Sequence, residues 1–397
     1  MTRTHVRSWE YRDGGVVSIN DGETVVRVHP NVPYWAIAAN MACGADLKSG
    51  PARIFALSVT DRCNIACDFC CHPYLDSALS EQDCVRMVQE ACELPFDEIC
   101  VTGGEPYTRR RLVYRLASIC KERGRLFGSI TNGFWARNRE RAFLIAENMI
   151  EHGVARVTFS WDPSHGEFVA PQTVQNGIDA CMRAGLRVCL TGSFKEDGDC
   201  HANYGIDVSA YEQYANFSLV AGHAEPAGRG KDLDLRLRTV SPDAAQNLIC
   251  PGRGVQELVV YARDGLAQPC CSIYAGYDMP QLRIGDWRRQ SVADLLDAQE
   301  GDAYFRVIAD GGFRLLYEIL AERAPDLAAR LPDPRDALSA CQLCESVMTG
   351  PDAATIRRIC DEYLTERLNA VVLDNAQLLA ALLPDVLAQP PEARTPA

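Results

Sequence analysis

The chain has 397 residues, of which 47% are hydrophobic and 23% charged, and a formal net charge of −13. This length allows two or more domains with a large core. The acidic balance offers no broad basic surface for phosphate backbones, which argues against a nucleic-acid partner. Residues 1–11 lack the apolar segment of a signal peptide, and no run approaches the ~20 apolar residues that span a bilayer. We therefore expect a cytoplasmic protein without a membrane partner.

Eighteen cysteines are many for such a chain. Without an export signal they indicate reduced thiols, metal sites and buried apolar side chains rather than disulfides. Six of them fall on apolar helix faces or inside predicted strands, where a thiol behaves as a small hydrophobic group: Cys84, Cys92, Cys100, Cys120, Cys181 and Cys189.

Residues 1–50 are predicted to form an N-terminal extension. Two valine-rich runs, 16–19 and 24–28, flank the turn Asn20–Gly22 and predict a β-hairpin.

From residue 54 onwards, predicted strands alternate with predicted helices. The strands are expected at 54–60, 96–102, up to 131, 154–160, 186–191 and 217–220. Helices are expected to start at Ser80 with a capping box, at Arg109 and near Asn138, and two of them to end at Gly153 and Gly185. This alternation predicts parallel βαβ units, two short of a closed eight-stranded barrel. We predict an α/β fold with a partial (β/α)6 TIM-like barrel over 51–230, whose chemistry lies at the C-terminal ends of its strands.

The pattern changes after the barrel. Residues 231–350 contain loops, short strands and a helical stretch near 312–331, and are predicted to form a small second domain. Residues 351–397 are predicted to form C-terminal helices that end in a disordered, proline-containing tail over 389–397.

Three cysteines, Cys63, Cys67 and Cys70, follow the first barrel strand with gaps of three and two residues. Three thiolates can bind three irons of a [4Fe–4S] cube and leave the fourth iron open to a small molecule. The alternative is a zinc knuckle, with Cys71 or His72 as the fourth ligand.

A second motif, Gly103-Gly104-Glu105-Pro106, ends the next predicted strand. Glycines let backbone approach a ligand closely, and their exposed amides and carbonyls beside a carboxylate suit the ammonium group of an amino acid. By itself the motif is a turn signal. In this order after the three cysteines, it makes residues 54–230 resemble the radical S-adenosylmethionine (radical SAM) enzymes.

The resemblance implies roles for these residues. Cys63, Cys67 and Cys70 would ligate a [4Fe–4S] cluster, Gly103–Glu105 would hold the methionyl amine of S-adenosylmethionine, and Phe69 would contact its adenine. An electron from a flavodoxin- or ferredoxin-type donor would then cleave the sulfonium to a 5′-deoxyadenosyl radical, which abstracts hydrogen from the substrate.

Other residues at the predicted strand ends are candidates with ordinary alternatives. Ser160 and Asp162 could bind ribose hydroxyls or cap a helix. Thr191 resembles a position near adenine or ribose. Arg229 could meet the cofactor carboxylate or lie at the surface. His165, with Asp162, is the candidate catalytic acid or base, and the alternative is a loop histidine with structural hydrogen bonds. Asn132 before Gly133 indicates a turn.

A second cysteine set follows. Cys250 precedes Gly265 by fourteen intervening residues, four more separate Gly265 from Cys270, and Cys341 and Cys344 form a CxxC. This order resembles the SPASM extension of radical SAM enzymes. Because no cysteine stands between Cys344 and Cys360, it resembles the shortened twitch form. Four thiolates could enclose one auxiliary [4Fe–4S] cluster; Cys271 is an alternative ligand, Cys360 fits a helix core, and zinc is the alternative metal.

The sequence thus predicts a radical SAM enzyme with one auxiliary cluster. The extension favours modification of a ribosomal peptide. The alternative is an enzyme acting on a small molecule such as a sugar, an aminocyclitol or an antibiotic precursor. The alternative of another class is a non-enzymatic protein stabilised by iron–sulfur or zinc.

Overall fold

The computed structural model describes most of residues 53–374 and three short strands before them. The described residues are 8–12, 16–20, 25–28 and 53–374, without 71, 73–75, 197, 226–227, 235–247, 249, 251–256 and 270–278. The Cys270 ligand and its alternative Cys271 therefore lie outside the described residues, as does the predicted tail. In the described part, no helix is both long and apolar enough to cross a membrane.

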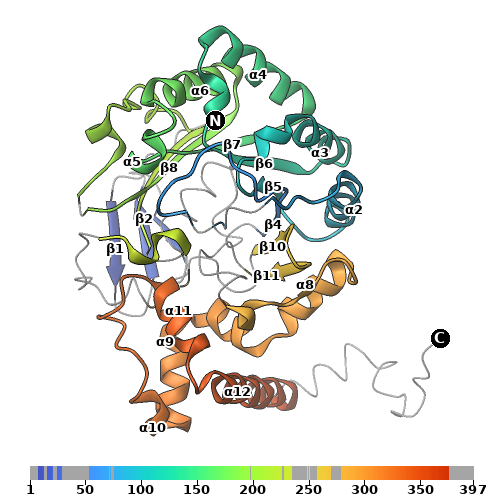
Figure 1. Cartoon of the computed structure of the whole chain (residues 1–397). Helices are drawn as coiled ribbons and strands as arrows, with labels where there is room; N and C mark the ends of the chain where they lie inside the picture. Colours follow the sequence, from blue (N-terminus) through green and yellow to red (C-terminus); the bar gives the residue numbers. More distant parts are fainter. Residues whose placement is uncertain are drawn as a thin grey trace, which may run out of the picture.

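A nine-stranded open sheet forms the centre of the molecule (Figure 1), in the order β12-β11-β10-β4-β5-β6-β7-β8-β9. The six strands from β4 to β9 run parallel in chain order. Their bounds are β4 Ile54–Ser58, β5 Glu98–Thr102, β6 Leu126–Thr131, β7 Arg156–Ser160, β8 Arg187–Phe194 and β9 Phe217–His223. The predicted α/β partial barrel is confirmed, since six parallel strands alternate with helices and the sheet does not close.

Helices between these strands cover the outer face of the sheet (Figure 1). Their bounds are α2 Glu81–Cys92, α3 Arg110–Glu122, α4 Arg139–His152, α5 Pro163–Gly166 and α6 Pro171–Ala184, with 3-10 turns η2 Pro106–Arg109, η3 Phe134–Ala136 and η4 His201–Tyr204. A further 3-10 turn, η5 Gly228–Asp232, follows β9. The Ser80 hydroxyl accepts from Asp83 N at the start of α2. Gly153 and Gly185 end α4 and α6 at φ 96° and 87°, a left-handed conformation that glycine adopts without steric cost. These predicted helix boundaries are confirmed.

Three later strands extend the barrel sheet, an arrangement that the sequence did not predict. The strands are β10 Glu257–Tyr261, which pairs parallel with β4, and β11 Leu266–Gln268 and β12 Gly285–Asp286, which are antiparallel. The turn between β10 and β11 contains Asp264 and Gly265, both with positive φ, and it joins the two strands into an antiparallel hairpin.

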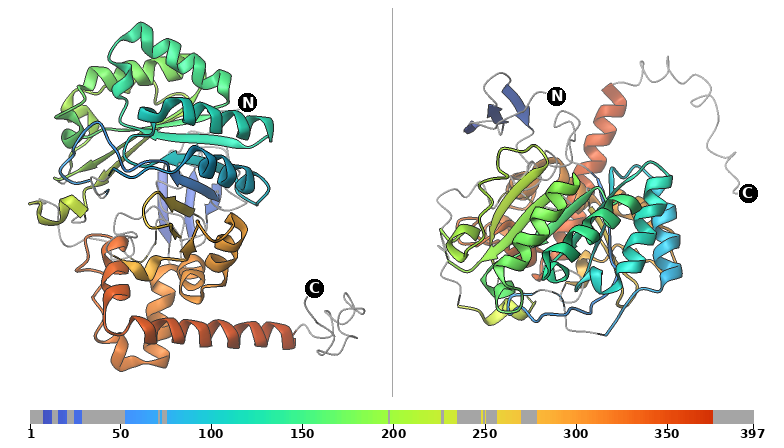
Figure 2. Two further views of the ribbon diagram at one scale, coloured as in Figure 1. Left: turned by 45° about the vertical axis from the view of Figure 1, so that its right-hand side comes forward. Right: turned by 90° about the horizontal axis from the view of Figure 1, so that it is seen from above.

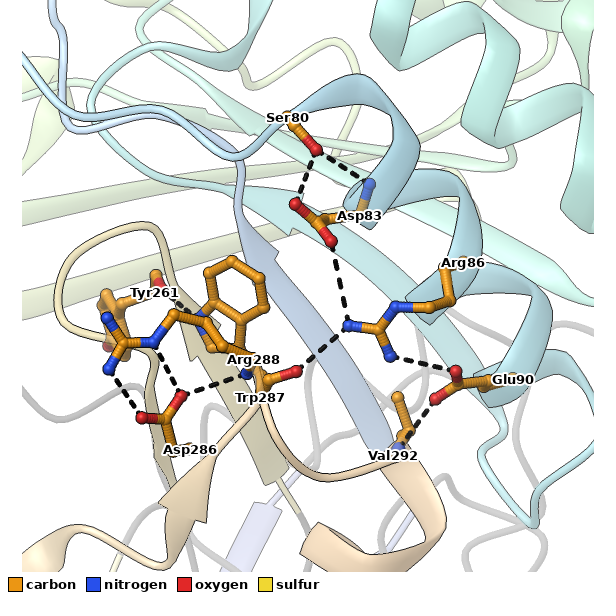
Figure 3. Close-up of polar contacts among 9 residues, drawn as sticks. All are labelled: Ser80, Asp83, Arg86, Glu90, Tyr261, Asp286, Trp287, Arg288 and Val292. Carbon is orange, nitrogen blue, oxygen red and sulfur yellow. Dashed lines mark hydrogen bonds and ion pairs between the residues drawn. The ribbon is translucent and has the colours of Figure 1, made fainter.

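Polar contacts join the three added strands, and residues 287–292 after them, to α2 (Figure 3). Arg86 donates to Trp287 O at 3.0 Å and to Glu90, and the other Glu90 oxygen accepts from Val292 N at 2.8 Å. Trp287, 7% exposed, donates through its indole nitrogen to Tyr261 O. The three added strands and residues 287–292 therefore share both the sheet and a hydrogen-bond network with the barrel.

Helices α9 Ala303–Arg323, α10 Pro325–Ala328, α11 Ala340–Thr349 and α12 Ala353–Asp374 form a second core below the barrel (Figure 2), together with the turn η6 Pro280–Leu282. Helix α8 Val292–Gly301 packs on the barrel core instead, through Val292, Leu295 and Leu296. The helical stretch predicted near 312–331 is present, but it begins earlier and breaks at Gly312, whose φ is 63°. At the other end of the chain, β1 Ser8–Arg12, β2 Val16–Asn20 and β3 Val25–Val28 form a separate antiparallel sheet, so the predicted hairpin gains a third strand.

Candidate functional site

The cysteine loop leaves β4 and is held by the end of β5. Gly104 N donates to Thr60 O at 2.7 Å, and Glu105 N donates to Arg62 O at 2.9 Å. A Cβ on Gly103 would lie 2.3 Å from Thr60 O, and one on Gly104 would lie 2.1 Å from Arg62 O. The two glycines therefore allow the second motif to pack directly on the start of the cysteine loop. The Gly104 amide, which the sequence analysis expected to face a ligand, is bonded to that loop instead.

Glu105 lies at the centre of the site, 1% exposed. Its Oε1 accepts from Tyr107 N and from the Thr131 hydroxyl, both at 2.9 Å, and its Oε2 accepts from Asn132 N at 2.8 Å. A carboxylate has about four acceptor positions, so one position remains for a further donor. Burial raises the pKa of Glu105 to about 7, against the lowering effect of these three donors. A cationic donor would favour its ionised form.

The three cysteine thiols lie in one loop at this edge of the sheet. Cys67 is 4% exposed, and Cys63 and Cys70 are half-buried. Burial, with smaller contributions from the like charges of Glu105 and Cys70, raises the pKa of the Cys63 thiol to about 11. Burial also raises the pKa of Cys67, to which Cys70 and Cys63 add. The thiols therefore lie within electrostatic reach of one another, and a metal would have to displace their protons on binding. In the described part of the chain, no three His, Cys, Asp or Glu side chains converge on a position for a single metal ion.

Asn132 joins the end of β6 to the same loop. Its Nδ2 donates to Asn64 Oδ1 at 3.0 Å and lies 3.9 Å from Cys63 Sγ. The turn predicted after it is present, with Gly133 at φ 74°. The sequence predicts Asn132 only as part of that turn. Its contact with the cysteine loop depends on residues 68 positions away, so no local pattern could indicate it.

Asp162, 1% exposed, is the N-cap of α5. Its Oδ1 accepts from Ser164 N and His165 N, and its Oδ2 accepts from Ser193 N, all at 3.1 Å. The same Oδ2 lies 2.9 Å from His165 Nδ1. The structure therefore places Asp162 in the capping position, with all four contacts inside the protein. It also fixes the orientation of the His165 ring.

The His165 ring packs edge-on against Phe69, with 5.5 Å between ring centroids. Phe69 precedes Cys70, and Arg229 N donates to Cys70 O at 3.1 Å. The positive charge of Arg229 also lies close enough to lower the pKa of Cys67 against the effects of burial and like charge. Candidates from β7 and from the turn after β9 thus meet on the cysteine loop, as the barrel prediction required.

Ser160 and Thr191 face each other across β7 and β8. Both are half-buried. Ser160 is the last residue of β7, whereas β8 continues past the predicted end at Thr191 to Phe194. Gly192 follows, and a Cβ there would lie 2.4 Å from Trp161 O and 2.8 Å from His201 Nε2. These two candidates occupy the same edge as the cysteine loop. Among the residues that the structure describes, no hydrogen bond joins either of them to a cysteine side chain.

The described members of the second cysteine set lie in the second core, below the barrel. Cys341 and Cys344 are on α11, and with Cys250 they pack on the same apolar cluster. Burial, with a smaller contribution from the neighbouring Cys250, raises the pKa of Cys344 to about 12. The Tyr304 hydroxyl lies 3.5 Å from Cys344 Sγ. Cys360 is fully buried in this core, as its helical pattern predicted.

Comparison with known proteins identifies the barrel. Residues 57–193 match the Radical SAM superfamily. Over 315 residues the chain is 21% identical to YydG of Bacillus subtilis (strain 168), a protein named for peptide biosynthesis, covering 76% of this chain and 93% of that protein. It is 32% identical over 136 residues to GTP 3′,8-cyclase of Parasynechococcus marenigrum (strain WH8102), covering 32% of this chain and only 38% of the cyclase.

Two solved structures are similar at low sequence identity. One is native anSMEcpe with bound AdoMet and Cp18Cys peptide, at TM-score 0.45 and 14% identity, covering 81% of this chain and 99% of that one. The other is Streptococcus suis SuiB bound to precursor peptide SuiA, at TM-score 0.42 and 14% identity, covering 73% and 75%.

Proposed function

We propose that this radical SAM enzyme modifies a peptide. The enzyme class follows from residues 57–193, which form a radical SAM domain. The support for a peptide substrate is the similarity to YydG, which extends over 93% of that protein and so beyond the shared domain. The similarity to the GTP cyclases ends within 32% of this chain. The similarity to the cyclases therefore supports a shared cofactor site and does not indicate the substrate.

The domain implies a [4Fe–4S] cluster and S-adenosylmethionine, and Cys63, Cys67 and Cys70 are the residues proposed to hold the cluster. The fit rests on three thiols within one loop and within electrostatic reach of one another. When bound and reduced by a flavodoxin- or ferredoxin-type donor, the two cofactors supply a 5′-deoxyadenosyl radical that removes hydrogen from the substrate.

The protein's own contribution is to bind and orient. The remaining acceptor position of Glu105 suits the ammonium group of S-adenosylmethionine, because a carboxylate buried at 1% exposure gains most from a cation. Arg229 offers a positive charge beside Cys67 for the cofactor's carboxylate. Gly103 and Gly104 act in this proposal by bringing Glu105 against the cysteine loop. Phe69 offers its ring near adenine, and Ser160 and Thr191 lie at the edge where ribose would extend.

His165 is the residue proposed for proton transfer. Asp162 Oδ2 lies 2.9 Å from its Nδ1 and so fixes the orientation of the ring. Asp162 acts in this account as a positioning residue, since its contacts all lie inside the protein.

We also propose one auxiliary [4Fe–4S] cluster in residues 231–350, held by Cys250, Cys270, Cys341 and Cys344. The support is the joint packing of Cys250, Cys341 and Cys344 on one apolar surface. Anaerobic reconstitution should give about eight irons per chain, for two four-iron clusters. About four irons together with one zinc would contradict this part of the proposal.

A labelled peptide tests the substrate class. The candidate is a short peptide encoded beside the gene, synthesised with deuterium at its carbon-bound positions. Peptide modification predicts deuterium in the 5′-deoxyadenosine released by the reduced, reconstituted enzyme, and a mass change in the peptide. Deuterium transfer from an aminocyclitol or sugar, with none from the peptide, would instead support the small-molecule alternative.

A further inference from the structure

A basic cavity of ≈ 800 Å³ opens beside the candidate site. It lies between the first turns of α3 and α4, two neighbouring helices on the outer face of the sheet (Figure 1). Five arginines line it: Arg109, Arg110, Arg111, Arg137 and Arg141. In a chain of net charge −13, this concentration of positive charge needs a physical reason.

Hydrogen bonds that support the fold explain the position of only one of these five arginine side chains. Arg109 donates to Val59 O at 2.7 Å and to Leu79 O at 2.8 Å, and so supports the segments on either side of the cysteine loop. Among the described residues, none of the other four arginines forms an ion pair with a carboxylate. The one acidic side chain of the lining, Glu81, is already paired with Arg115.

The position of these charges opposes helix stability. Arg110 and Arg111 begin α3, whose first turn holds no acidic residue and has no side-chain cap. Cations at a helix N-terminus are unfavourable, because the backbone dipole is positive there. Arg111, Arg137 and Arg141 are exposed and Arg110 is half-buried, so the guanidinium groups remain accessible to a ligand.

Two residues of the cavity wall are close in sequence to residues of the candidate site. Tyr107 in its wall follows Glu105 by two residues, and Phe134 follows Asn132 by two. Glu105 and Asn132 are the residues that contact each other and the cysteine loop. The cavity also has an apolar wall, formed by Leu112, Phe134 and Trp135. A ligand held there would extend naturally towards the edge where the chemistry takes place.

We propose that this cavity binds an acidic segment of the peptide substrate, at a distance from the residue that is modified. The inference rests on the proposed function and names the chemistry of the substrate. An arginine guanidinium group forms two parallel hydrogen bonds with a carboxylate. The apolar wall would accept a hydrophobic side chain that stands between the acidic residues of the ligand. A concave surface of this volume suits an extended segment better than the broad face of an electron-donor protein.

Binding of labelled peptides to the reconstituted enzyme tests the proposal without requiring turnover. The probes are a fluorescein-labelled peptide with four glutamates and two leucines, its matched glutamine peptide and its matched lysine peptide. Fluorescence anisotropy should show binding of the glutamate peptide at low salt and weakening as salt is raised. The glutamine and lysine peptides should bind at least about tenfold more weakly.

Variants locate the binding. Arg110→Gln/Arg137→Gln/Arg141→Gln should weaken the glutamate peptide by about tenfold or more. The matched control, Arg306→Gln/Arg314→Gln/Arg358→Gln, removes the same charge from exposed positions on α9 and α12 and should bind like the wild type. Circular dichroism checks that both variants fold, and the peptide series on the wild type tests the proposal even if one does not.

Two results would overturn it. One is equal binding of the glutamate and glutamine peptides to the wild type, or equal binding of the glutamate peptide to both variants. The other is slowed electron uptake from reduced flavodoxin in the cavity variant with unchanged peptide binding, which would assign the cavity to the donor. Deuterium transfer from a peptide is measured separately, so failure here leaves the peptide-modifying activity standing.

Discussion

Replacing Glu105 by glutamine should change how the stability of the protein depends on pH. Burial raises the pKa of Glu105 from 4.5 to about 7. Between these values the native state holds a proton that the unfolded chain has released. The stability that this carboxyl contributes is therefore fully present below pH 4.5 and is lost as the pH rises through 7.

The magnitude follows from the linkage relation. At ~1.36 kcal/mol per pKa unit, the full loss is about 3 kcal/mol, and about 2 kcal/mol of it falls between roughly pH 5.5 and pH 8. Glutamine does not titrate. The unfolding free energy of Glu105→Gln minus that of the wild type should therefore rise by about 2 kcal/mol across this range.

Urea unfolding of the cluster-free protein, followed by tryptophan fluorescence, measures this difference. Trp135, 6% exposed, donates to the same Thr131 hydroxyl that donates to Glu105, so it reports on the region concerned. Glu140→Gln, at an exposed position on α4, controls for the loss of one carboxyl. If the stabilities of Glu105→Gln and wild type follow parallel curves with pH, the described environment of Glu105 is wrong.

Substitutions at three further positions, Glu98, Gly104 and Asp162, test other parts of the structure. Glu98→Ala leaves Arg156 buried at 8% exposure without its carboxylate and should cost about 3–5 kcal/mol in urea unfolding; a loss below about 1 kcal/mol would contradict the buried pair. Gly104→Ala should displace the cysteine loop and lower the iron bound on reconstitution, whereas Gly301→Ala, with nothing within 4 Å of its Cβ, should bind iron like the wild type. Asp162→Ala should lose about 1–2 kcal/mol of stability as a lost N-cap, and Asp162→Asn should retain most of it while slowing turnover through a misoriented His165; equal stability of the two variants would argue against the capping role.

Local patterns predicted the barrel because each boundary has a local cause. Gly153 and Gly185 end helices through a left-handed conformation, and the Ser80 hydroxyl caps α2 through a contact three residues away. The spacing of Cys63, Cys67 and Cys70 was informative for the same reason, because all three lie in one loop.

Features that depend on distant contacts could not be predicted. The pairing of β10 with β4 joins residues about 200 positions apart, and neither strand carries a signal for the other. Asn132 looks like a turn residue until the fold brings Cys63 and Asn64 to it. Asp162 suits a cap or a ribose ligand equally well by residue type, and only its bonds to Ser164, His165 and Ser193 distinguish them.

Formation of 5′-deoxyadenosine most directly tests the central claim, that Cys63, Cys67 and Cys70 hold the cluster of a radical SAM enzyme. Reconstituted protein is given S-adenosylmethionine and dithionite without oxygen, and the product is quantified by mass spectrometry. We predict product from the wild type and from the control Cys200→Ala, and none from Cys63→Ala/Cys67→Ala/Cys70→Ala. Product formation that survives in the triple variant would contradict the account.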